Sequence, residues 1–439
     1  MRLTTSLSLS LLMLFAFQAS AQTLTLAECL DRASQHNREL QLAHFNVDLA
    51  RDDVSLARST YLPRLDLEAG YTRQNEPQAL RFGGTEVPIQ EDGYRFANAS
   101  VTQPIYTFGR LGANYDRAQT LVSLADHEYQ ATRQTVFLQI VAAYYGVLEA
   151  EQLLSTASAE AAQMSDHLRV AKDFLAAGVT TEDDLLQAEV QLASSKHQQL
   201  SADNALANRW LVLNRLTCRE ADFRAELQIL DDPGQALSSD GLQTALRDRP
   251  EIRAALERIR IADLTRTEAK AGYAPELFAR LAADYVENNK AAENTILSAT
   301  IGFRINLFDG LATSARNRKA LTARAQAQAA LTRLQDDIAL EYRTASNDKT
   351  VALQRIDTTA AAIEQAVENL RITRERYQAL VGTATEVVDA QTLLTRTKND
   401  RSRALFDYHV AAARVEKAAG LLGTTSASQP TQNPSRSSP

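Results

Sequence analysis

The sequence lacks the residues and motifs that most enzymes, metal proteins and nucleic-acid-binding proteins require. It has only two cysteines, Cys29 and Cys218, which we expect either to pair or to be small buried residues. Its six histidines show no metal-binding spacing, and there is no glycine-rich phosphate loop and no G-x-S-x-G motif. The formal net charge is −7, which argues against a nucleic-acid partner. We therefore predict a protein that is not an enzyme and holds no metal or cofactor.

Long apolar runs are missing after the first 21 residues. Residues 1–21 are typical of a secretory signal peptide, with Arg2, an apolar stretch from Leu7 to Phe17, and the small residues Ala19 and Ala21. This stretch is shorter than the ~20 apolar residues that cross a bilayer. No later run reaches the length of a membrane-spanning helix. If the mature protein lies in a membrane, the remaining structure is a closed β-barrel.

An internal repeat divides the mature chain into two halves. One constant shift aligns identical residues of the two halves without a gap, and the period is far longer than that of a solenoid. We therefore expect a first structural repeat at residues 22–235, a second at residues 236–423, and a disordered polar tail at residues 424–439. The identical pairs are Leu30 with Leu242, Ala33 with Ala245, Glu39 with Glu251, Ala43 with Ala255, Ala50 with Ala262, Ala57 with Ala269, Tyr61 with Tyr273, Pro63 with Pro275 and Leu65 with Leu277.

Proline is absent from two long stretches, one between Pro104 and Pro233 and the other between Pro275 and Pro430. A proline inside a helix costs about 3 kcal/mol, and both stretches are rich in strong helix formers. Apolar residues recur at spacings of three and four, which predicts helices with an apolar stripe. This pattern alone suits a soluble coiled coil equally well. Examples are Phe137, Val141, Tyr144 and Leu148, and Ile363, Val367, Leu370 and Tyr377.

A turn signal interrupts each stretch near its middle, at residues 178–181 and at residues 381–383. Each stretch is therefore predicted to fold as a helical hairpin. The returning helices are too short to match the long ones, and the helical segment that begins each half supplies the missing length if it stacks end to end on the returning helix. The predicted helices are Leu26–Thr60, Leu111–Ala177, Thr180–Leu216, Asp240–Gly272, Ala312–Leu380 and Thr383–Leu422.

Between the first and the long helix of each half, the apolar period changes to two, which predicts strands with one apolar and one polar face. A fourth strand, about Phe96–Ile105, is less regular because Asn98 and Gln103 interrupt both faces. Such alternation over about 10 residues is typical of a transmembrane barrel. An amphipathic sheet on a soluble core is the alternative, although no second apolar layer is evident to cover it. The three clear runs are Leu65–Tyr71, Leu277–Tyr285 and Leu297–Leu307.

Four strands are too few to close a barrel, because small closed barrels need about eight. Several chains must therefore contribute to one barrel. The loops at residues 75–93 and 286–294 are polar and are expected at its outward end.

Two halves that each contain a helix, two strands and a long helical hairpin resemble the TolC family of outer-membrane factors over essentially the whole mature chain. Short motifs beside the strands carry this resemblance, and they occur in the same order in each half. They are Ala57, Tyr61-Leu62-Pro63 and Gln103-Pro104-Ile105-Tyr106 in the first half, and Ala269, Tyr273-Ala274-Pro275 and Leu307-Phe308-Asp309-Gly310 in the second.

The resemblance implies a mainly α fold with a membrane β-barrel, in which three internally duplicated chains form a 12-stranded barrel on a periplasmic α-helical tunnel. It implies an outer-membrane channel subunit of a Gram-negative bacterium, a passive conduit for a tripartite efflux pump or a type I secretion system. The implied partners are two further copies of the chain, outer-membrane lipid, a periplasmic adaptor (membrane fusion) protein and an inner-membrane pump.

The resemblance also places the periplasmic entrance of the channel at the hairpin turns. Glu386 and Asp389 correspond to a ring of carboxylates that narrows the entrance, and rings of carboxylates select cations. The alternative is a solvated acidic helix start. Asp184 and Tyr377 match contacts that hold the entrance closed. The turns themselves are expected to dock the adaptor, through Gly178, Val179, Thr180 and Thr181 in one and Val381, Gly382 and Thr383 in the other.

Two residues depart from the family pattern. Gly382 stands where the family has an arginine that helps to lock the entrance, and Leu380 stands where a glycine commonly ends the second long helix. We therefore expect a weaker or differently built lock. The competing interpretation of the whole chain is a soluble periplasmic coiled-coil adaptor of such a pump. Adaptors usually have one helical hairpin beside small β domains, so two hairpins and four strands favour the channel.

Overall fold

The structure is a computed structural model that describes residues 23–228 and 241–423. The predicted signal peptide and the predicted tail lie outside the described residues. The chain divides into two compact units. The strand unit comprises residues 38–138, 241–350 and 411–423, and the tip unit comprises residues 23–37, 139–228 and 351–410.

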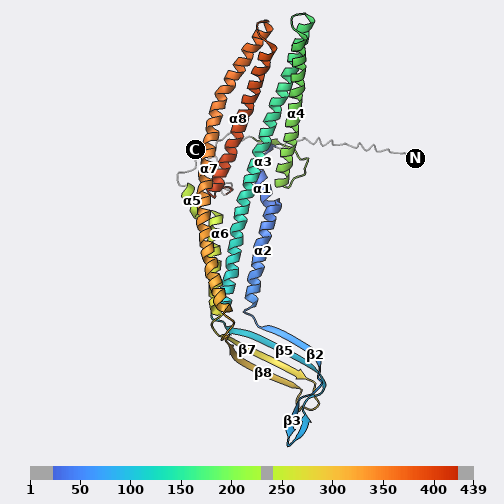
Figure 1. Ribbon diagram of the computed structural model, residues 1–439, viewed down its shortest axis with the longest axis vertical. Helices are drawn as coiled ribbons and strands as arrows, with labels where there is room; N and C mark the ends of the chain where they lie inside the picture. The colour runs from blue at the N-terminus through green and yellow to red at the C-terminus, as the bar shows by residue number, and fades with distance from the viewer. Residues whose placement is uncertain (1–22, 229–240, 424–439) are drawn as a thin grey trace, which may run out of the picture. The chain divides into compact units, whose positions relative to one another are not determined.

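The two halves of the chain repeat one order of main elements: two shorter helices, two long strands, a long helix and a return helix (Figure 1). The long helices have 67 residues each and the return helices 35 each, which confirms the two predicted hairpins. None of the described helices has the length and apolar character needed to cross a membrane. The helices are α1 Leu26–His36, α2 Arg38–Ser59, α3 Arg110–Ala176, α4 Glu182–Leu216, α5 Gly241–Asp248, α6 Pro250–Ala271, α7 Ala312–Gln378 and α8 Ala384–Ala418.

The single helix predicted at the start of each half is wrong, because each segment forms two helices. α1 ends at His36, and the next residue, Asn37, has an extended backbone (φ −63°, ψ 129°). The buried side-chain amide of Asn37 donates to the Leu216 carbonyl oxygen at 2.8 Å. Between α5 and α6, Arg249 lies outside the helical region (φ −58°, ψ 138°), since the ring of Pro250 disfavours the helical conformation of the residue before it.

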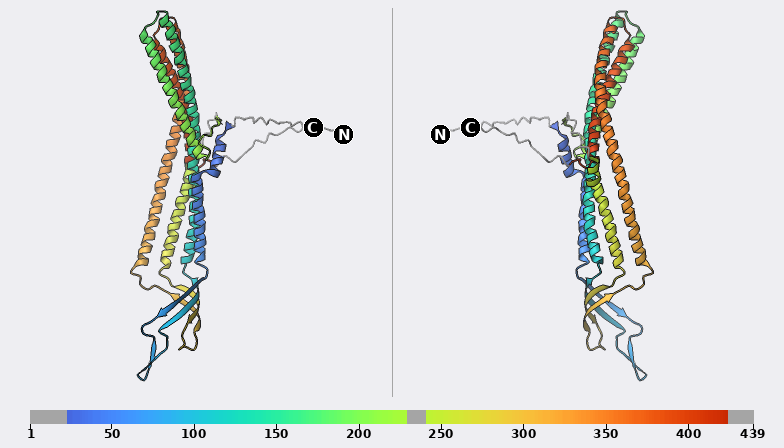
Figure 2. Two further views of the ribbon diagram at one scale, coloured as in Figure 1. Left: turned by 90° about the vertical axis from the view of Figure 1, so that its right-hand side faces the viewer. Right: turned by 90° about the vertical axis from the view of Figure 1, so that its left-hand side faces the viewer.

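The four predicted strands form one antiparallel sheet in the order β2-β5-β7-β8, and the views in Figure 2 show its strong twist. The last strand ends at Arg304 and not at the predicted Leu307, because its last partner in the register is Glu276, the first residue of the neighbouring strand. The strand bounds are β2 Arg64–Arg73, β5 Gly93–Tyr106, β7 Glu276–Val286 and β8 Thr295–Arg304.

The register places the alternating side chains of all four strands on common faces. One row of paired residues across the sheet is Leu65, Val101, Leu281 and Ala299. This apolar face is exposed, with Leu67 at 76% and Leu297 at 80%. On the other face the Asn98 amide donates to the Asp284 carboxylate, so Asn98 belongs to the polar side of the sheet. The sheet of one chain therefore has a continuous, uncovered apolar face.

Two short strand pairs were not predicted. β3 (Ala79–Phe82) and β4 (Thr85–Pro88) form a hairpin inside the first polar loop, and Gly83 and Gly84 join them with positive φ of 57° and 91°. β1 (Thr23–Leu24) pairs in parallel with β6 (Glu226–Leu227). Strands of two to four residues are too short to produce a recognisable alternation.

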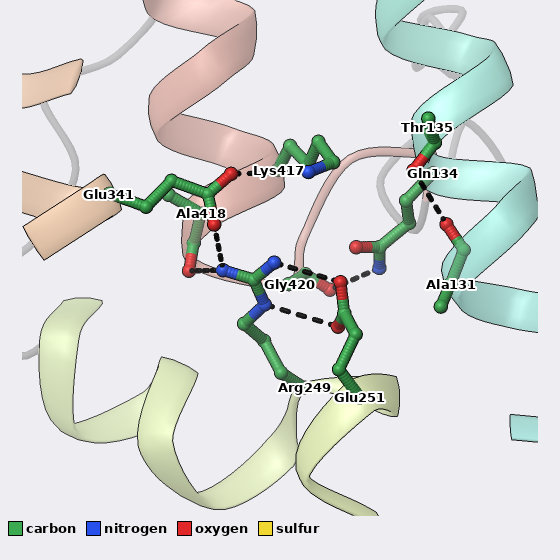
Figure 3. Close-up of polar contacts among 9 residues, drawn as sticks. All are labelled: Ala131, Gln134, Thr135, Arg249, Glu251, Glu341, Lys417, Ala418 and Gly420. Atoms are coloured by element: carbon green, nitrogen blue, oxygen red, sulfur yellow. Dashed lines mark hydrogen bonds and ion pairs between the residues drawn. The ribbon is translucent and has the colours of Figure 1, made fainter. Parts of the chain in front are cut away.

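An ion network around the buried Arg249 in the strand unit joins the α5–α6 junction to α7 and to the end of α8 (Figure 3). Arg249, 3% exposed, donates to both carboxylate oxygens of Glu251 at 2.8 and 3.1 Å and to one oxygen of Glu341 at 2.6 Å. The Lys417 ammonium lies 3.1 Å from the other Glu341 oxygen. Burial opposes ionisation, but the hydrogen bonds and charge of Arg249 hold the pKa of Glu251 and of Glu341 below the usual value. Every carboxylate oxygen of this network therefore has a cationic partner.

Arg249→Ala is expected to lower the free energy of unfolding by about 1–3 kcal/mol at pH 7, because it leaves two partly exposed carboxylates without this cation. Arg249→Lys is the matched variant: it keeps the charge, loses the two-pronged contact with Glu251, and should cost less. Denaturant titration measures both.

The cost of Arg249→Ala should shrink in acid. The folded pKa values of Glu251 and Glu341 are lowered, so their stabilisation is present above the ordinary value of 4.5 and is lost as the pH falls through the folded values. An equal cost at pH 7 and pH 3 would contradict this account.

Candidate functional site

The first hairpin turn lies between α3 and α4 in the tip unit. Gly178 has a φ of 70°, and two backbone hydrogen bonds close the end of α3, from Gly178 N–H to the Leu175 carbonyl and from Val179 N–H to the Phe174 carbonyl, both at 2.9 Å. This pair of bonds is the Schellman motif, for which glycine is the favoured residue. Thr181 then caps α4 by accepting a hydrogen bond from the backbone N–H of Asp184 at 3.4 Å.

The second turn, between α7 and α8, has the same conformation built from different residues. Leu380 occupies the left-handed position with a φ of 61°, and Val381 N–H donates to the Arg376 carbonyl at 3.0 Å. Thr383 caps α8 by accepting from the backbone N–H of Glu386 at 3.3 Å. Leu380 thus corresponds to Gly178 and Glu386 to Asp184. Position 380 has leucine and not glycine, yet α7 ends with the same geometry as α3. The leucine side chain therefore occupies a left-handed backbone position that disfavours side chains.

Gly382 contributes to this turn through close packing. A Cβ atom at Gly382 would lie 3.2 Å from Cβ of Arg376 and 3.2 Å from the backbone nitrogen of Tyr377. The turn therefore folds back onto the last turn of α7 at a distance that leaves little room for a side chain. This close contact gives a steric reason for glycine at position 382.

The two carboxylates predicted to narrow an entrance are exposed near the start of α8, three residues apart. One oxygen of Glu386 lies 3.6 Å from a guanidinium nitrogen of Arg376, with the two side chains 44% and 53% exposed. Exposed ion pairs contribute about 0–1 kcal/mol, so Arg376 neutralises Glu386 without fixing it in place. Asp389 makes no hydrogen bond or ion pair in the part of the chain that the structure describes.

Tyr377 and Asp184, predicted to close the entrance, lie in one cluster without a hydrogen bond between them. The Tyr377 ring is 7% exposed and packs on His167 and Phe174, with ring centroids 5.4 and 5.6 Å away. Its hydroxyl has no hydrogen-bond partner among the described residues. The Asp184 carboxylate instead accepts a hydrogen bond from the Thr180 hydroxyl. Burial, and then the charge of Asp184, raise the pKa of Tyr377.

The structure adds His167, which is not among the residues that the sequence predicted for the entrance. His167 is 8% exposed and lines a cavity of about 230 Å³ together with Met164, Arg374 and Tyr377. Burial, and then the charge of Arg374, lower its pKa, while the charge of Asp184 opposes them. The spacing of Met164, His167, Val170 and Phe174 is helical, so this stripe was a signal available from the sequence.

Within residues 23–228 and 241–423, no group of three His, Cys, Asp or Glu side chains is arranged to hold a metal ion. The two cysteines are free and do not pair. Cys29 is fully buried, and this burial raises the pKa of its thiol to about 12.

Leu380→Gly is expected to stabilise the second turn by about 0.5–1 kcal/mol, because glycine removes the left-handed strain at some cost in chain entropy. Gly178→Ala should destabilise the first turn by a similar amount. Amide hydrogen exchange in the last turns of α7 and α3 measures local opening. Ala379→Gly is the control, since Ala379 has an ordinary backbone conformation. If Ala379→Gly slows exchange as much as Leu380→Gly does, strain at Leu380 is not the cause.

Acidification is expected to loosen the packing around His167. The folded pKa of His167 is lowered, so protons bind preferentially to the open or unfolded state as the pH falls below the ordinary value of 6.5. The local free energy of opening should fall between pH 7 and pH 5, by at most about 1.4 kcal/mol per pH unit. Hydrogen exchange in α3 should show this decline, and His167→Gln should remove it. His197→Gln, at an exposed histidine of α4, should leave it unchanged; equal slopes in all three proteins would exclude His167 as the cause.

Comparisons with known proteins place the chain in a family. A family model described as "Outer membrane efflux protein" matches residues 29–219 and 241–421. The outer membrane protein TolC of Vibrio cholerae is 27% identical over 413 residues, which cover 90% of this chain and 91% of that protein. The alkaline protease secretion protein AprF of Pseudomonas aeruginosa is 23% identical, over 93% of this chain and 87% of that protein.

A solved structure shows the same fold. The CmeC outer membrane channel of Campylobacter jejuni superimposes with a TM-score of 0.80 at 18% identity, over 90% of this chain and 85% of that chain.

These findings confirm the resemblance inferred from the sequence and favour the channel over the periplasmic adaptor. The protein is an outer-membrane channel subunit of an efflux or type I secretion system, and the members of its family are channels and not enzymes. Since the family model matches most of both halves, the chain belongs to the family of outer membrane efflux proteins.

Proposed function

We propose that three copies of this chain form one passive conduit, with their sheets joined edge to edge as a twelve-stranded barrel and their helices as a periplasmic tunnel. The observation that carries this proposal is the sheet. It has an uncovered apolar face, its outer strands β2 and β8 each have one neighbour within the described chain, and four strands are too few to close. Lipid would cover the face, and neighbouring copies would pair with the edges.

The conduit would serve an efflux pump or a type I secretion system, through a periplasmic adaptor protein and an inner-membrane pump. The family description supports efflux, and the name of AprF supports protein secretion. In this proposal the inner-membrane pump supplies the energy for transport, and the conduit is passive. We also propose that the chain consists of two structural repeats, residues 22–235 and 236–423. The two segments that the family model matches support this division.

We further propose that the two hairpin turns form the closed entrance and dock the adaptor, with Glu386 and Asp389 lining its constriction. The exposure of both carboxylates on one face of α8 supports this role. Arg376 also belongs to this proposed entrance, because its contact with Glu386 offsets one of the two negative charges in each chain. The buried ring of Tyr377, beside Asp184, would hold the end of α7 in place.

The test is single-channel recording in planar bilayers with the purified protein. Glu386→Gln with Asp389→Asn should change the conductance and reduce the preference for cations, because the double variant removes six carboxylates from a trimeric entrance. Arg376→Ala should act in the opposite direction and increase the preference for cations. Glu364→Gln, at an exposed carboxylate elsewhere on α7, is the control and should change neither property.

If the double variant and Arg376→Ala both leave conductance and ion preference unchanged, these carboxylates do not line the constriction. If the purified wild-type protein is a monomer in detergent by light scattering, the proposed trimeric conduit itself is wrong.

A further inference from the structure

The helix α2 has two apolar faces, and its own chain covers only one of them. The buried face consists of Leu40, Val47, Ala50 and Ala57. Four further large apolar residues recur at spacings of three and four on the opposite face, with one aspartate among them, and all are exposed. A continuous apolar stripe of this kind marks an interaction surface. We call it the α2 stripe, and its residues are Leu42, Phe45, Leu49, Asp52 and Leu56.

The helix α7 has an exposed face of small residues. Its buried side packs on α5 and α6, where Ile338 clusters with Ile252 and Arg324 forms an ion pair with Asp263 at 2.6 Å. The side of α7 that faces away from these contacts has the same spacing of three and four as the α2 stripe. We call it the α7 stripe, and its residues, all exposed, are Ala315, Arg318, Thr322, Ala325 and Ala329.

The two stripes lie at opposite edges of the strand unit. Near the sheet, α2 and α7 are the outer helices of a row, with α3 and α6 between them (Figures 1 and 2). α2 leads into β2 and α7 follows β8, and these are the two edge strands of the sheet. When copies of the chain pair at those edges, α2 of one copy and α7 of the next leave the joined strands side by side and antiparallel. This step rests on the proposed conduit.

The stripes match residue by residue when they are counted from the helix ends that face the sheet. Leu49 lies ten residues before Ser59, the end of α2, and Thr322 lies ten residues after Ala312, the start of α7. The other four pairs agree to within one residue, which is about 1.5 Å along a helix. The pairs are Leu56 with Ala315, Asp52 with Arg318, Leu49 with Thr322, Phe45 with Ala325 and Leu42 with Ala329.

Size and charge are both complementary in this register. Each large apolar side chain of the α2 stripe meets an alanine or a threonine, and facing helices pack closely when large residues lie opposite small ones. The single charge of each stripe also meets its opposite. Asp52 and Arg318 are exposed, and neither has an ion pair within the part of the chain that the structure describes.

We propose that the α2 stripe of one copy packs antiparallel on the α7 stripe of the next copy, with Asp52 paired to Arg318. This contact joins the helical walls of adjacent copies, as the sheet edges join their strands. It assigns an occupant to the exposed leucines and the phenylalanine of α2, which water would otherwise surround.

Cross-linking of the full-length protein in detergent with a short bismaleimide tests the register. Leu49→Cys with Thr322→Cys should give covalently joined copies on denaturing gels. Leu49→Cys with Leu340→Cys is the matched control, because Leu340 is also exposed on α7 but lies 18 residues further along, about 27 Å away. Wild type and the single variants report any linkage through Cys29 and Cys218. A trimer by light scattering that links no better than the control overturns the proposed packing and leaves the conduit standing, whereas a monomer overturns both.

Exchange of the two charges tests the ion pair. Asp52→Arg and Arg318→Asp should each raise the protein concentration at which half of the trimer dissociates by about tenfold or more, because every seam then brings like charges together. Asp52→Arg combined with Arg318→Asp should return it to within about threefold of the wild type, since the pair is restored with its signs exchanged. Light scattering measures dissociation, and circular dichroism checks that each variant is folded. If the double variant dissociates as readily as the single variants, Asp52 and Arg318 do not face each other.

Discussion

The register of the four long strands constrains most of what this protein can be. Successive side chains of a strand alternate between faces, so the alignment of Leu65, Val101 and Leu281 collects the large apolar residues on one side. A slip of one residue in any strand would mix the two faces. The apolar face remains uncovered in one chain, and Leu297 on it is 80% exposed. In a family of outer-membrane channels, such a face supports the proposed contact with lipid, and the two sheet edges support the proposed pairing with further copies of the chain.

The two hairpin turns show how a duplicated unit keeps its geometry while its residues diverge. Both end the long helix with the same pair of backbone hydrogen bonds, and both cap the return helix with a threonine, Thr181 or Thr383. The first turn has glycine at the left-handed position, and the second has Leu380 there and a glycine two residues later. Glycine at position 382 lets the second turn approach Arg376, whose guanidinium group lies near Glu386. The second turn therefore keeps the conformation of the first with different residues at its strained and its crowded positions.

Buried polar groups in the two units follow opposite arrangements. In the strand unit, Arg249 and Lys417 satisfy every carboxylate oxygen of Glu251 and Glu341 (Figure 3). In the tip unit, one oxygen of Glu160 has no partner among the described residues. A satisfied network rigidifies the helices that it joins, whereas a buried oxygen without a partner lowers the free energy of unfolding. The same physical chemistry thus stabilises the cluster of the strand unit and makes the burial of Glu160 costly.

The sequence by itself determined the duplicated order of elements, because the periods of helix and strand recur many times in long segments. α3 was expected to begin at Leu111 and begins at Arg110. α7 was expected to end at Leu380 and ends at Gln378. The break at Arg249 had a local signal in Pro250. The break at Asn37 had none, because the partner of its side chain is the Leu216 carbonyl, supplied by packing.

Only the tertiary structure decided which polar side chains are satisfied. Periodicity is a local property that is repeated along one segment, whereas the partner of a buried charge comes from another helix. Glu341 lies 92 positions after Arg249, and no local pattern pairs them. The surroundings of His167 likewise depend on Arg374 and Tyr377 of a different helix. The fold could therefore be predicted from the sequence, while the state of its buried charges required the packed helices.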